Sequence, residues 1–287
     1  MSSFTPTLRT SKRSRREFLL IGASATLSKL TATPAADDVP VRDGIPWVDY
    51  HVHIGDEVSV DQAIRIAKQR GMKFGLLQHA GVRGHGFAVS DDETLNAWVR
   101  SLEGKPVFKG IEAETNNWMS AFSRDCIARL DYIQADALGL PDRSGSPMQI
   151  WKPDFRPGNT QEFMDRYVDF HVQRISAEPI DILVVPTFLP DGLLPDYERL
   201  WTPKRMQTVI DAAVKANVAL EIDCRFRVPR LSFLEMARAA GVKFAFGSNY
   251  QNASGIGDIS YCAEMYRRLG LTISQFFLPA GAAKRFR

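Results

Sequence analysis

The sequence predicts an α/β fold in which parallel strands alternate with helices and close into a barrel. From residue 45 onward, short apolar runs with period-two alternation are followed by stretches with apolar residues at helical spacing. Seven such strands over ~240 residues match the size of a closed β/α barrel. A doubly wound sheet is the alternative. It would usually carry a glycine-rich phosphate loop after an early strand, and residues 81–86 match that pattern poorly.

The elements follow one another in a regular order. The first strand, 47–53, alternates in polarity, and the helix at 60–70 ends at Gly71, a residue type favoured just after a helix. Further strands are expected at 73–78, 106–113, 131–134, 180–186, 218–222 and 242–246. Further helices are expected at 91–102, 123–130, 161–176, 204–216, 233–240 and 258–269. Residues 139–160, rich in Pro and Gly, are expected to form a long loop or insertion.

The first 36 residues have the layout of an export signal. Basic residues precede a modest apolar stretch at 18–27, and small residues follow up to Ala36. The run SRREFL at 14–19 resembles the twin-arginine signal. We therefore expect residues 1–36 to be a twin-arginine-type signal peptide and residues 37–287 to be a single barrel domain. The resemblance implies export of a folded protein to the periplasm or the extracellular space.

Composition narrows the possible partners. Residues 1–36 hold six of the 36 basic residues and one of the 33 acidic residues, so the remainder is nearly neutral and does not favour nucleic-acid binding. No run of about 18 apolar residues occurs, so no transmembrane segment is expected. The three cysteines, Cys126, Cys224 and Cys262, include no C-x-x-C spacing. We interpret them as buried small hydrophobic residues, and a single disulfide pair remains open.

Candidate metal ligands follow the first three predicted strands. His51 and His53 are two residues apart, so both imidazoles leave the same face of their strand. His79 follows the second strand, and Glu112 lies at the end of the third, with Glu114 as a competing candidate. The carboxyl ends of barrel strands are where active sites are built, and imidazole with carboxylate is a common ligand set for Zn²⁺. Strand-end histidines without a metal are the simpler alternative.

The order of these motifs resembles the PHP family, the polymerase and histidinol phosphatase metal hydrolases, from about residue 47 to 271. The matching segments are 49–53 (D-x-H-x-H), 77–79 (T-D-H), 109–112 (G-x-E), 130–133 (the strand before S-V-H), 181–186 (D-I-L-x-H-P), 220–223 (L-E-I-N) and 246–251 (x-G-S-D-A-H). The resemblance implies a distorted (β/α)7 TIM-like barrel that binds up to three metals and cleaves phosphate esters.

The chain departs from the family's ligand pattern. The resemblance implies one site with His51, His53 and Glu112, and with Asn249 where an aspartate belongs. In the second site, Leu138 (or Ala137) and Val185 stand where the family has histidines. The third site keeps His79, but Gln251 stands in place of a histidine, and Ser59 or Glu57 in place of the remaining ligand. Because Val and Leu cannot ligate a metal, a two-metal clamp on phosphate is not expected.

The expected activity is that of a metal-dependent, phosphoesterase-type hydrolase with one Zn²⁺ or Mn²⁺ ion. Such an ion lowers the pKa of its bound water to about 7. His79 would act as general acid or base beside Glu112. Arg225 and Arg227 would bind a small, anionic substrate together with Gln251. The simpler interpretation of the two arginines is a solvated loop.

Two other functions remain open. The first is a catalytically inactive PHP-like protein whose pocket binds a ligand, which Asn249, Val185 and Leu138 favour. The second is an amidohydrolase-type enzyme acting on carbon–nitrogen or lactone bonds, because that superfamily also opens with D-x-H-x-H and has a G-S-D near its end.

Overall fold

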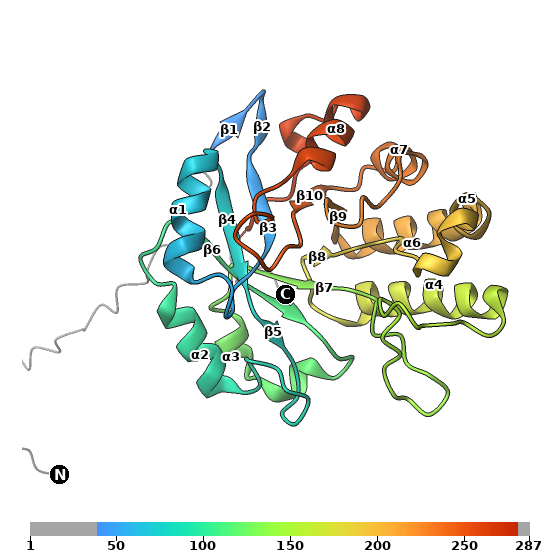
Figure 1. Ribbon diagram of the computed structural model, residues 1–287, viewed down its shortest axis with the longest axis horizontal. Coiled ribbons are helices and arrows are strands. Elements are labelled where there is room, and N and C mark those ends of the chain that lie inside the picture. The colour runs from blue at the N-terminus through green and yellow to red at the C-terminus, as the bar shows by residue number, and fades with distance from the viewer. Residues whose placement is uncertain (1–38, 281–287) are drawn as a thin grey trace, which may run out of the picture. The chain divides into compact units, whose positions relative to one another are not determined.

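Parallel strands form the centre of the fold, and their order in space follows their order in the chain (Figure 1). The computed structural model describes residues 39–280. The strands in spatial order are β3 (Val48–His53), β4 (Lys73–Leu77), β6 (Phe108–Ala113), β7 (Tyr132–Ala135), β8 (Ile182–Leu183), β9 (Ala219–Asp223) and β10 (Phe244–Gly247). The short strand β5 (His79–Ala80) follows β4 after one residue and also pairs with β6.

The first and last strands approach each other and nearly close the barrel. The Asn249 N–H donates to the carbonyl of His51 at 3.0 Å, and Val52 forms a parallel bridge with Tyr250. The Asp49 carboxylate accepts the Ser248 N–H at 2.9 Å across the same seam. The predicted seven-stranded α/β barrel is therefore confirmed, and the doubly wound alternative is excluded.

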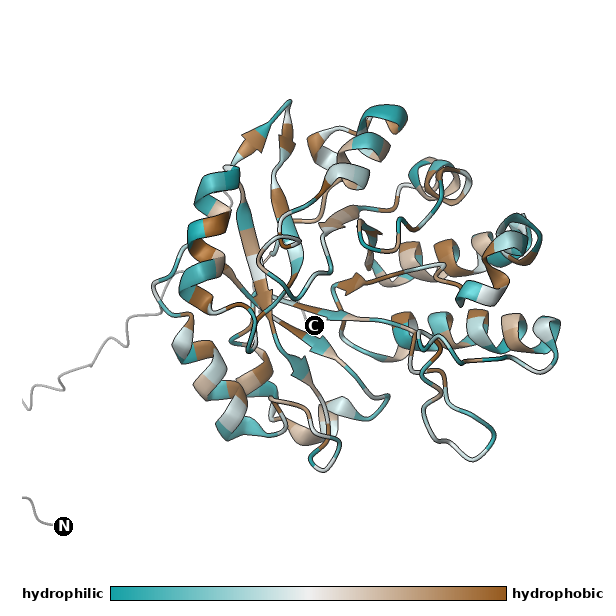
Figure 2. Ribbon diagram, in the orientation of Figure 1, coloured by the Kyte–Doolittle hydropathy of each residue, from teal (hydrophilic) through white to brown (hydrophobic). Residues whose placement is uncertain are grey.

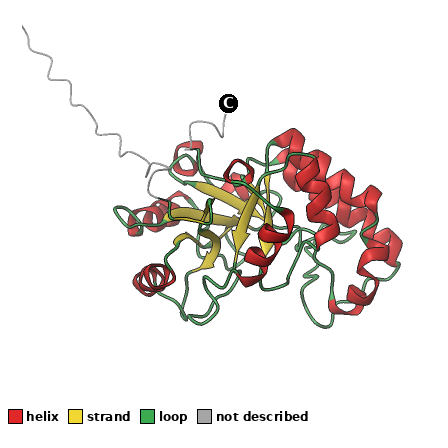
Figure 3. Cartoon of the chain, turned by 90° about the horizontal axis from the view of Figure 1, so that it is seen from above, coloured by secondary structure: helices red, strands yellow, loops and turns green. Residues whose placement is uncertain are grey.

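Helices surround the strands (Figures 1 and 3). They are α1 (Val60–Arg70), α2 (Asp92–Ser101), α3 (Arg124–Ile127), α4 (Thr160–Ala177), α5 (Tyr197–Leu200), α6 (Pro203–Ala216), α7 (Leu231–Ala239) and α8 (Ser260–Leu269). Four-residue or shorter 3₁₀ turns lie at Trp118–Ala121 and Ile273–Gln275, and a longer one at Asp191–Asp196. Hydrophobic residues run along the strands and in stripes on the helices, as expected for amphipathic helices packed on a sheet (Figure 2).

Local signals explain several helix ends. Helix α1 begins after Ser59, whose side chain accepts the Gln62 N–H, and it ends at Gly71 with a left-handed φ of 62°. Helix α2 begins with a capping box between Asp91 and Thr94. These caps fix where the helices start and stop, and so where the strand-end loops leave the barrel.

Tyr132 fills the barrel interior below the strand carboxyl ends. Its hydroxyl donates to the carbonyl of Tyr50 at 2.7 Å. A Cβ at Gly110 would lie 2.2 Å from Tyr132 Cζ, and one at Gly75 would lie 2.5 Å from its hydroxyl oxygen. The two glycines therefore provide the space for this ring.

The structure corrects some of the expected boundaries. The strand expected at 180–186 is only Ile182–Leu183, because Val185 and Thr187 have left-handed φ values of 49° and 69° that leave the extended conformation. A two-stranded hairpin, Val41–Arg42 with Ile45–Pro46, was not expected. Residues 139–159 form a loop with one isolated bridge, as predicted.

No helix among residues 39–280 is long and apolar enough to cross a membrane. The expected signal peptide lies outside the described residues.

Candidate metal centre

His51, His53 and Glu112 converge at the carboxyl ends of β3 and β6. His51 Nε2 lies 3.1 Å from His53 Nε2 and 3.6 Å from Glu112 Oε1, and His53 Nε2 lies 3.4 Å from Glu112 Oε2. All three side chains are buried. In a tetrahedral zinc site, each ligand atom lies about 2.1 Å from the ion, so two ligand atoms are about 3.4 Å apart. The three donors therefore have the type and the spacing of a metal half-site.

Strand geometry explains this convergence. His51 and His53 leave the same face of β3, as their separation of two residues requires. The register between β3 and β4 shifts between Asp49 and Val52, so the strand contains an irregularity next to His51. On the neighbouring strands, Glu112 is in register with His79. The three histidines and the glutamate therefore share one layer at the top of the barrel.

Glu221 on β9 holds His51 from the other side. Its Oε1 is 2.7 Å from His51 Nδ1, and its Oε2 accepts the Val185 N–H at 2.7 Å. A carboxylate that accepts a hydrogen bond from one ring nitrogen fixes the tautomer and leaves the other nitrogen free to bind a metal. Val185 and Leu138, which stand where the resemblance implied histidines, are both buried, and Val185 contributes only its backbone to this arrangement.

Two further groups of metal-type side chains adjoin this one. His51, Glu221 and Asp223 form one group, and His79, Glu112 and Glu114 form the other; in each group the donor atoms lie within 4.8 Å of one another. Both groups share a member with the central trio, so the three groups are not independent sites. The buried His, Glu and Asp residues can hold a metal ion.

The carboxylates set the protonation of two histidines. Burial lowers the pKa of His51, but the charges of Glu221 and Glu112 more than offset this and raise it well above its usual value. Burial also lowers the pKa of His79, but its hydrogen bond to Glu114 and the charge of Glu112 raise it to about 9. Burial holds the pKa of His53 well below its usual value, so this imidazole is neutral. Protonated His51 therefore donates a hydrogen bond from Nε2 to His53 Nε2, at 3.1 Å.

Two further buried acidic groups near the trio have raised pKa values. Burial raises the pKa of Asp136 to about 8, helped by the charges of Glu114 and Glu112. Burial likewise raises the pKa of Asp223 to about 8, helped by Glu221. Two carboxyl groups near the trio thus retain their protons at neutral pH, chiefly because burial disfavours their charged forms and secondly because other carboxylates lie nearby. A bound divalent cation would favour their ionised forms.

Polar atoms in and beside the trio have no partner. Within residues 39–280, His53 Nδ1 and both side-chain amide atoms of Gln134 are buried without a hydrogen-bond partner. Gln134 is in register with Glu112 on the adjacent strand, so its amide belongs to the same layer. Buried polar groups normally have partners, and exceptions point to a ligand, ion or water. This pattern fits the metal proposed from the donor set.

Arg174 on α4 ties together the loops that carry the acidic groups. It is 1% exposed and donates to the carbonyls of Ala113 at 2.5 Å and Asp136 at 2.9 Å. The guanidinium also pairs with Glu178, at 2.6 Å. The buried guanidinium of Arg174 therefore joins the ends of β6 and β7, and no sequence pattern singled this residue out.

The other expected site residues lie around this layer. The Asn249 side-chain amide donates to Asp223 Oδ2 at 2.8 Å. Arg225 is exposed and donates to the Asn249 carbonyl at 3.3 Å. Arg227 pairs with Glu264 at 3.3 Å, on the side of α8, and Gln251 is exposed. Asn249 and Arg225 thus adjoin the cluster, whereas Arg227 is engaged away from it.

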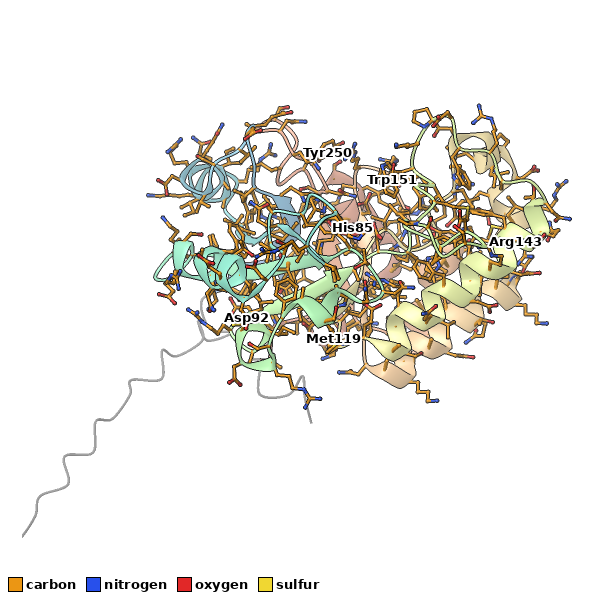
Figure 4. All side chains as sticks on the ribbon, turned by 90° about the horizontal axis from the view of Figure 1, so that it is seen from below. His85, Asp92, Met119, Arg143, Trp151 and Tyr250 are labelled. Carbon is orange, nitrogen blue, oxygen red and sulfur yellow. The ribbon has the colours of Figure 1, made fainter. Side chains whose placement is uncertain are left out.

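Loops after the strands surround the same end of the barrel. His85, Trp151 and Tyr250, labelled in Figure 4, come from the loops after β5, β7 and β10. The Trp151 side chain is 43% exposed. In β/α barrels these loops supply the residues that contact a substrate.

Sequence reasoning missed Glu221, Asp223 and Asp136 as site residues. Glu221 and Asp223 are two residues apart on an otherwise apolar, buried strand, the same spacing as His51 and His53. That pattern was a usable signal, because two carboxylates on one face of a buried strand need partners. Asp136 gave no comparable signal, since it follows β7 in a loop of mixed composition.

No family model matches the chain, and no curated protein matches it. Solved structures with some likeness include a β-mannanase from Thermomonospora fusca in complex with mannotriose, at 14% identity and a TM-score of 0.43, with 82% of each chain covered. An HpcH/HpaI aldolase from Desulfitobacterium hafniense DCB-2 has 13% identity and a TM-score of 0.35, with 79% of this chain and 93% of that chain covered. A D-hydantoinase from a Bacillus sp. AR9 has 12% identity and a TM-score of 0.32, covering 70% of this chain and 46% of its own. These similarities are too weak to assign an activity.

Proposed function

We propose that this protein is a metal-dependent hydrolase whose ion is held by His51, His53 and Glu112. The observation that carries the proposal is the convergence of their donor atoms, with separations of 3.1 to 3.6 Å, in a buried layer at the carboxyl ends of the strands. Two histidines and one glutamate form a known ligand set for catalytic zinc. We propose a single Zn²⁺ or Mn²⁺ ion.

The chain's own residues orient this centre. A bound ion of this kind polarises a substrate oxygen and lowers the pKa of a water to about 7. Glu221 holds the His51 ring through Nδ1, so that Nε2 faces the other two ligands. Glu112 reaches both histidines, one with each carboxylate oxygen, and it also lies 3.5 Å from His79 Nδ1.

His79 is the residue that we propose as general acid or base. Its Nδ1 is hydrogen-bonded to Glu114, which leaves Nε2 for proton exchange with a substrate. Its side chain is 41% exposed, whereas His51 and His53 are almost completely buried, so it connects the layer to solvent. The His53 and His79 rings stack at 4.5 Å, which places this proton carrier beside the proposed ion.

A phosphate ester is the substrate class that we propose. The motif order that resembles the PHP family supports it, together with the exposed guanidinium of Arg225 next to Asn249. The side chains of Val185 and Leu138 favour the alternative of a ligand-binding protein without catalysis, since neither can bind a second ion. Hydrolysis of a carbon–nitrogen or lactone bond is the remaining alternative. We also propose that residues 1–36 direct export by the twin-arginine route.

Elemental analysis of protein purified without added metal tests the proposal. We expect about one equivalent of zinc or manganese, and its loss in the double variant His51→Ala/His53→Ala. The matched control is His85→Ala, because His85 is exposed on a loop outside the cluster, and it should retain the metal. Wild-type protein that takes up no metal under any loading condition would contradict the proposal.

A substrate panel then separates the activities. Metal-loaded protein is assayed with phosphomonoesters and phosphodiesters, and in parallel with cyclic amides and lactones, each with the metal-free double variant as the blank. Phosphate release that depends on the metal supports the phosphoesterase. Turnover of amides or lactones alone would favour the amidohydrolase-type reaction, and metal binding without turnover would favour the ligand-binding alternative.

A further inference from the structure

Two of the three cysteines are in contact inside the protein. Cys224 directly follows β9, and Cys262 lies in the first turn of α8. Their sulfur atoms are 3.2 Å apart, and the residues are 7% and 0% exposed. A disulfide bond has an S–S length of about 2.05 Å, so the sulfurs would need to approach by roughly 1 Å.

We propose that Cys224 and Cys262 form a disulfide bond that joins the end of β9 to α8. The two residues are 38 positions apart, and β10 lies between them in the chain. Cys126, by contrast, is on α3 and accepts a hydrogen bond from the Asn96 side chain at 3.0 Å. The pairing is therefore defined by contact, and Cys126 serves as an internal reference.

The surroundings favour Cys224 as the attacking thiol. The Cys262 N–H donates to Cys224 Sγ at 3.3 Å, and this N–H belongs to the first turn of a ten-residue helix. N–H groups at a helix N-terminus stabilise a thiolate. Cys262 instead donates its S–H to the carbonyl of Ile222 at 2.9 Å, and it is the more deeply buried of the two.

The oxidant is a small-molecule disulfide, such as oxidised glutathione. The Cys224 thiolate attacks one sulfur of that disulfide, which forms a mixed disulfide and releases one thiol. The Cys262 thiolate then attacks Cys224 Sγ, which forms the internal bond and releases the second thiol. The two protein thiols lose two electrons and two protons in total, and the oxidant's disulfide gains both to become two thiols.

The crosslink would stabilise the strands β9 and β10 beside the candidate metal centre. Cys224 is adjacent to Asp223, and its N–H donates to the Gly247 carbonyl at 2.9 Å, so it already joins β9 to β10. A bond across 38 positions restricts the unfolded chain and raises stability. For a domain of this size, we expect a rise in the thermal midpoint of about 5–10 °C.

Thiol counting on the full chain tests the pairing. Protein is equilibrated in glutathione buffers of increasing oxidised fraction, quenched with an alkylating reagent, and measured by intact mass and peptide mapping. We expect the number of free thiols to fall from three to one, with a Cys224–Cys262 peptide and a free Cys126. Cys126→Ser should still lose two thiols, whereas Cys224→Ser and Cys262→Ser should not form this peptide.

A second measurement covers the case in which burial keeps the oxidant out. The reduced chain is unfolded and refolded in the same oxidising buffers, so that both thiols are accessible before they are buried. Formation of the same crosslink, with a midpoint that falls again on reduction, supports the proposal. Three free thiols after oxidative refolding, or a crosslink that involves Cys126, would overturn it.

Discussion

Gly247 and Glu221 lie so close together that a Cβ at position 247 would be 1.8 Å from Glu221 Oε1. The same Cβ would lie 2.9 Å from His51 Cβ. The absence of a side chain on β10 therefore makes room for the carboxylate that orients His51. No rotation of Glu221 is available without loss of its hydrogen bonds to His51 and to the Val185 N–H.

The substitution Gly247→Ala should weaken metal binding. Its methyl group displaces Glu221 from His51, and loss of such a supporting carboxylate typically costs 10–100-fold in metal affinity. Isothermal titration of the metal-free protein with Zn²⁺ measures the change. The control is Gly192→Ala, because Gly192 has no atom within 4 Å of an added Cβ. Equal affinities for the two variants would show that Glu221 does not support the ligand.

His79→Gln should reduce turnover while the metal is retained. The glutamine cannot exchange a proton at neutral pH, and removal of a general acid or base costs about 10²–10⁴-fold in rate. Steady-state assay gives kcat, and elemental analysis of the same sample gives metal content. A loss of metal in parallel with kcat would instead make His79 a ligand.

Arg174→Met should destabilise the fold. The substitution leaves Glu178, whose side chain is 5% exposed, without its cation and frees the carbonyls of Ala113 and Asp136. Removal of one partner of a buried pair costs about 3–5 kcal/mol. Urea denaturation of the metal-free protein measures this cost. Arg143→Met, which removes an exposed pair with Glu162, is the control and should leave the midpoint unchanged.

The double variant Arg174→Met/Glu178→Gln refines this test. If the unpaired carboxylate causes most of the loss, the second substitution should restore part of the stability. If the freed carbonyls cause it, the double variant should be no more stable than Arg174→Met alone.

His171 should make stability depend on pH. Burial lowers its pKa to about 4, and only the backbone carbonyl of Tyr167, at 2.7 Å from Nδ1, opposes this shift. The unfolded chain binds a proton near pH 6.5 and the folded chain near pH 4, so stability rises with pH across this window. The His171 contribution is complete above pH 6.5, and about 3 kcal/mol of it is lost by pH 4.

Comparison with His171→Leu isolates this contribution. Both proteins are unfolded in urea at several pH values between 4 and 8, and the difference in the free energy of unfolding is plotted. The difference should change by about 3 kcal/mol between pH 6.5 and 4. A difference that is constant with pH would show that the His171 side chain takes up a proton without unfolding.

Most helices and strands could be predicted from the sequence, and so could the metal-ligand candidates His51, His53 and Glu112. Helix α1 follows directly from its apolar spacing and from Gly71, and His51 with His53 follows from the period of a strand. Strand β8 was predicted too long because nothing in its apolar sequence shows that Val185 turns to a left-handed φ of 49°.

The acidic residues around these ligands, such as Glu221 and Asp136, are positioned by contacts between distant parts of the chain. Glu221 is 170 positions from His51, and its place beside that ring requires the barrel to close and position 247 to lack a side chain. The pKa of Asp136 is raised by burial and then by the charges of Glu114 and Glu112, which lie just after and within β6. Neither fact is present in any single segment of the sequence.

Tyr132 gives the barrel a closed floor. Its ring occupies the space above Gly75 and Gly110, and its hydroxyl is bonded to the backbone of Tyr50. The candidate centre therefore faces the side of the barrel where the loops with His85, Trp151 and Tyr250 lie (Figure 4). If the proposed hydrolysis takes place there, substrate and product use the same side of the barrel, so product release as well as bond cleavage can limit the overall rate.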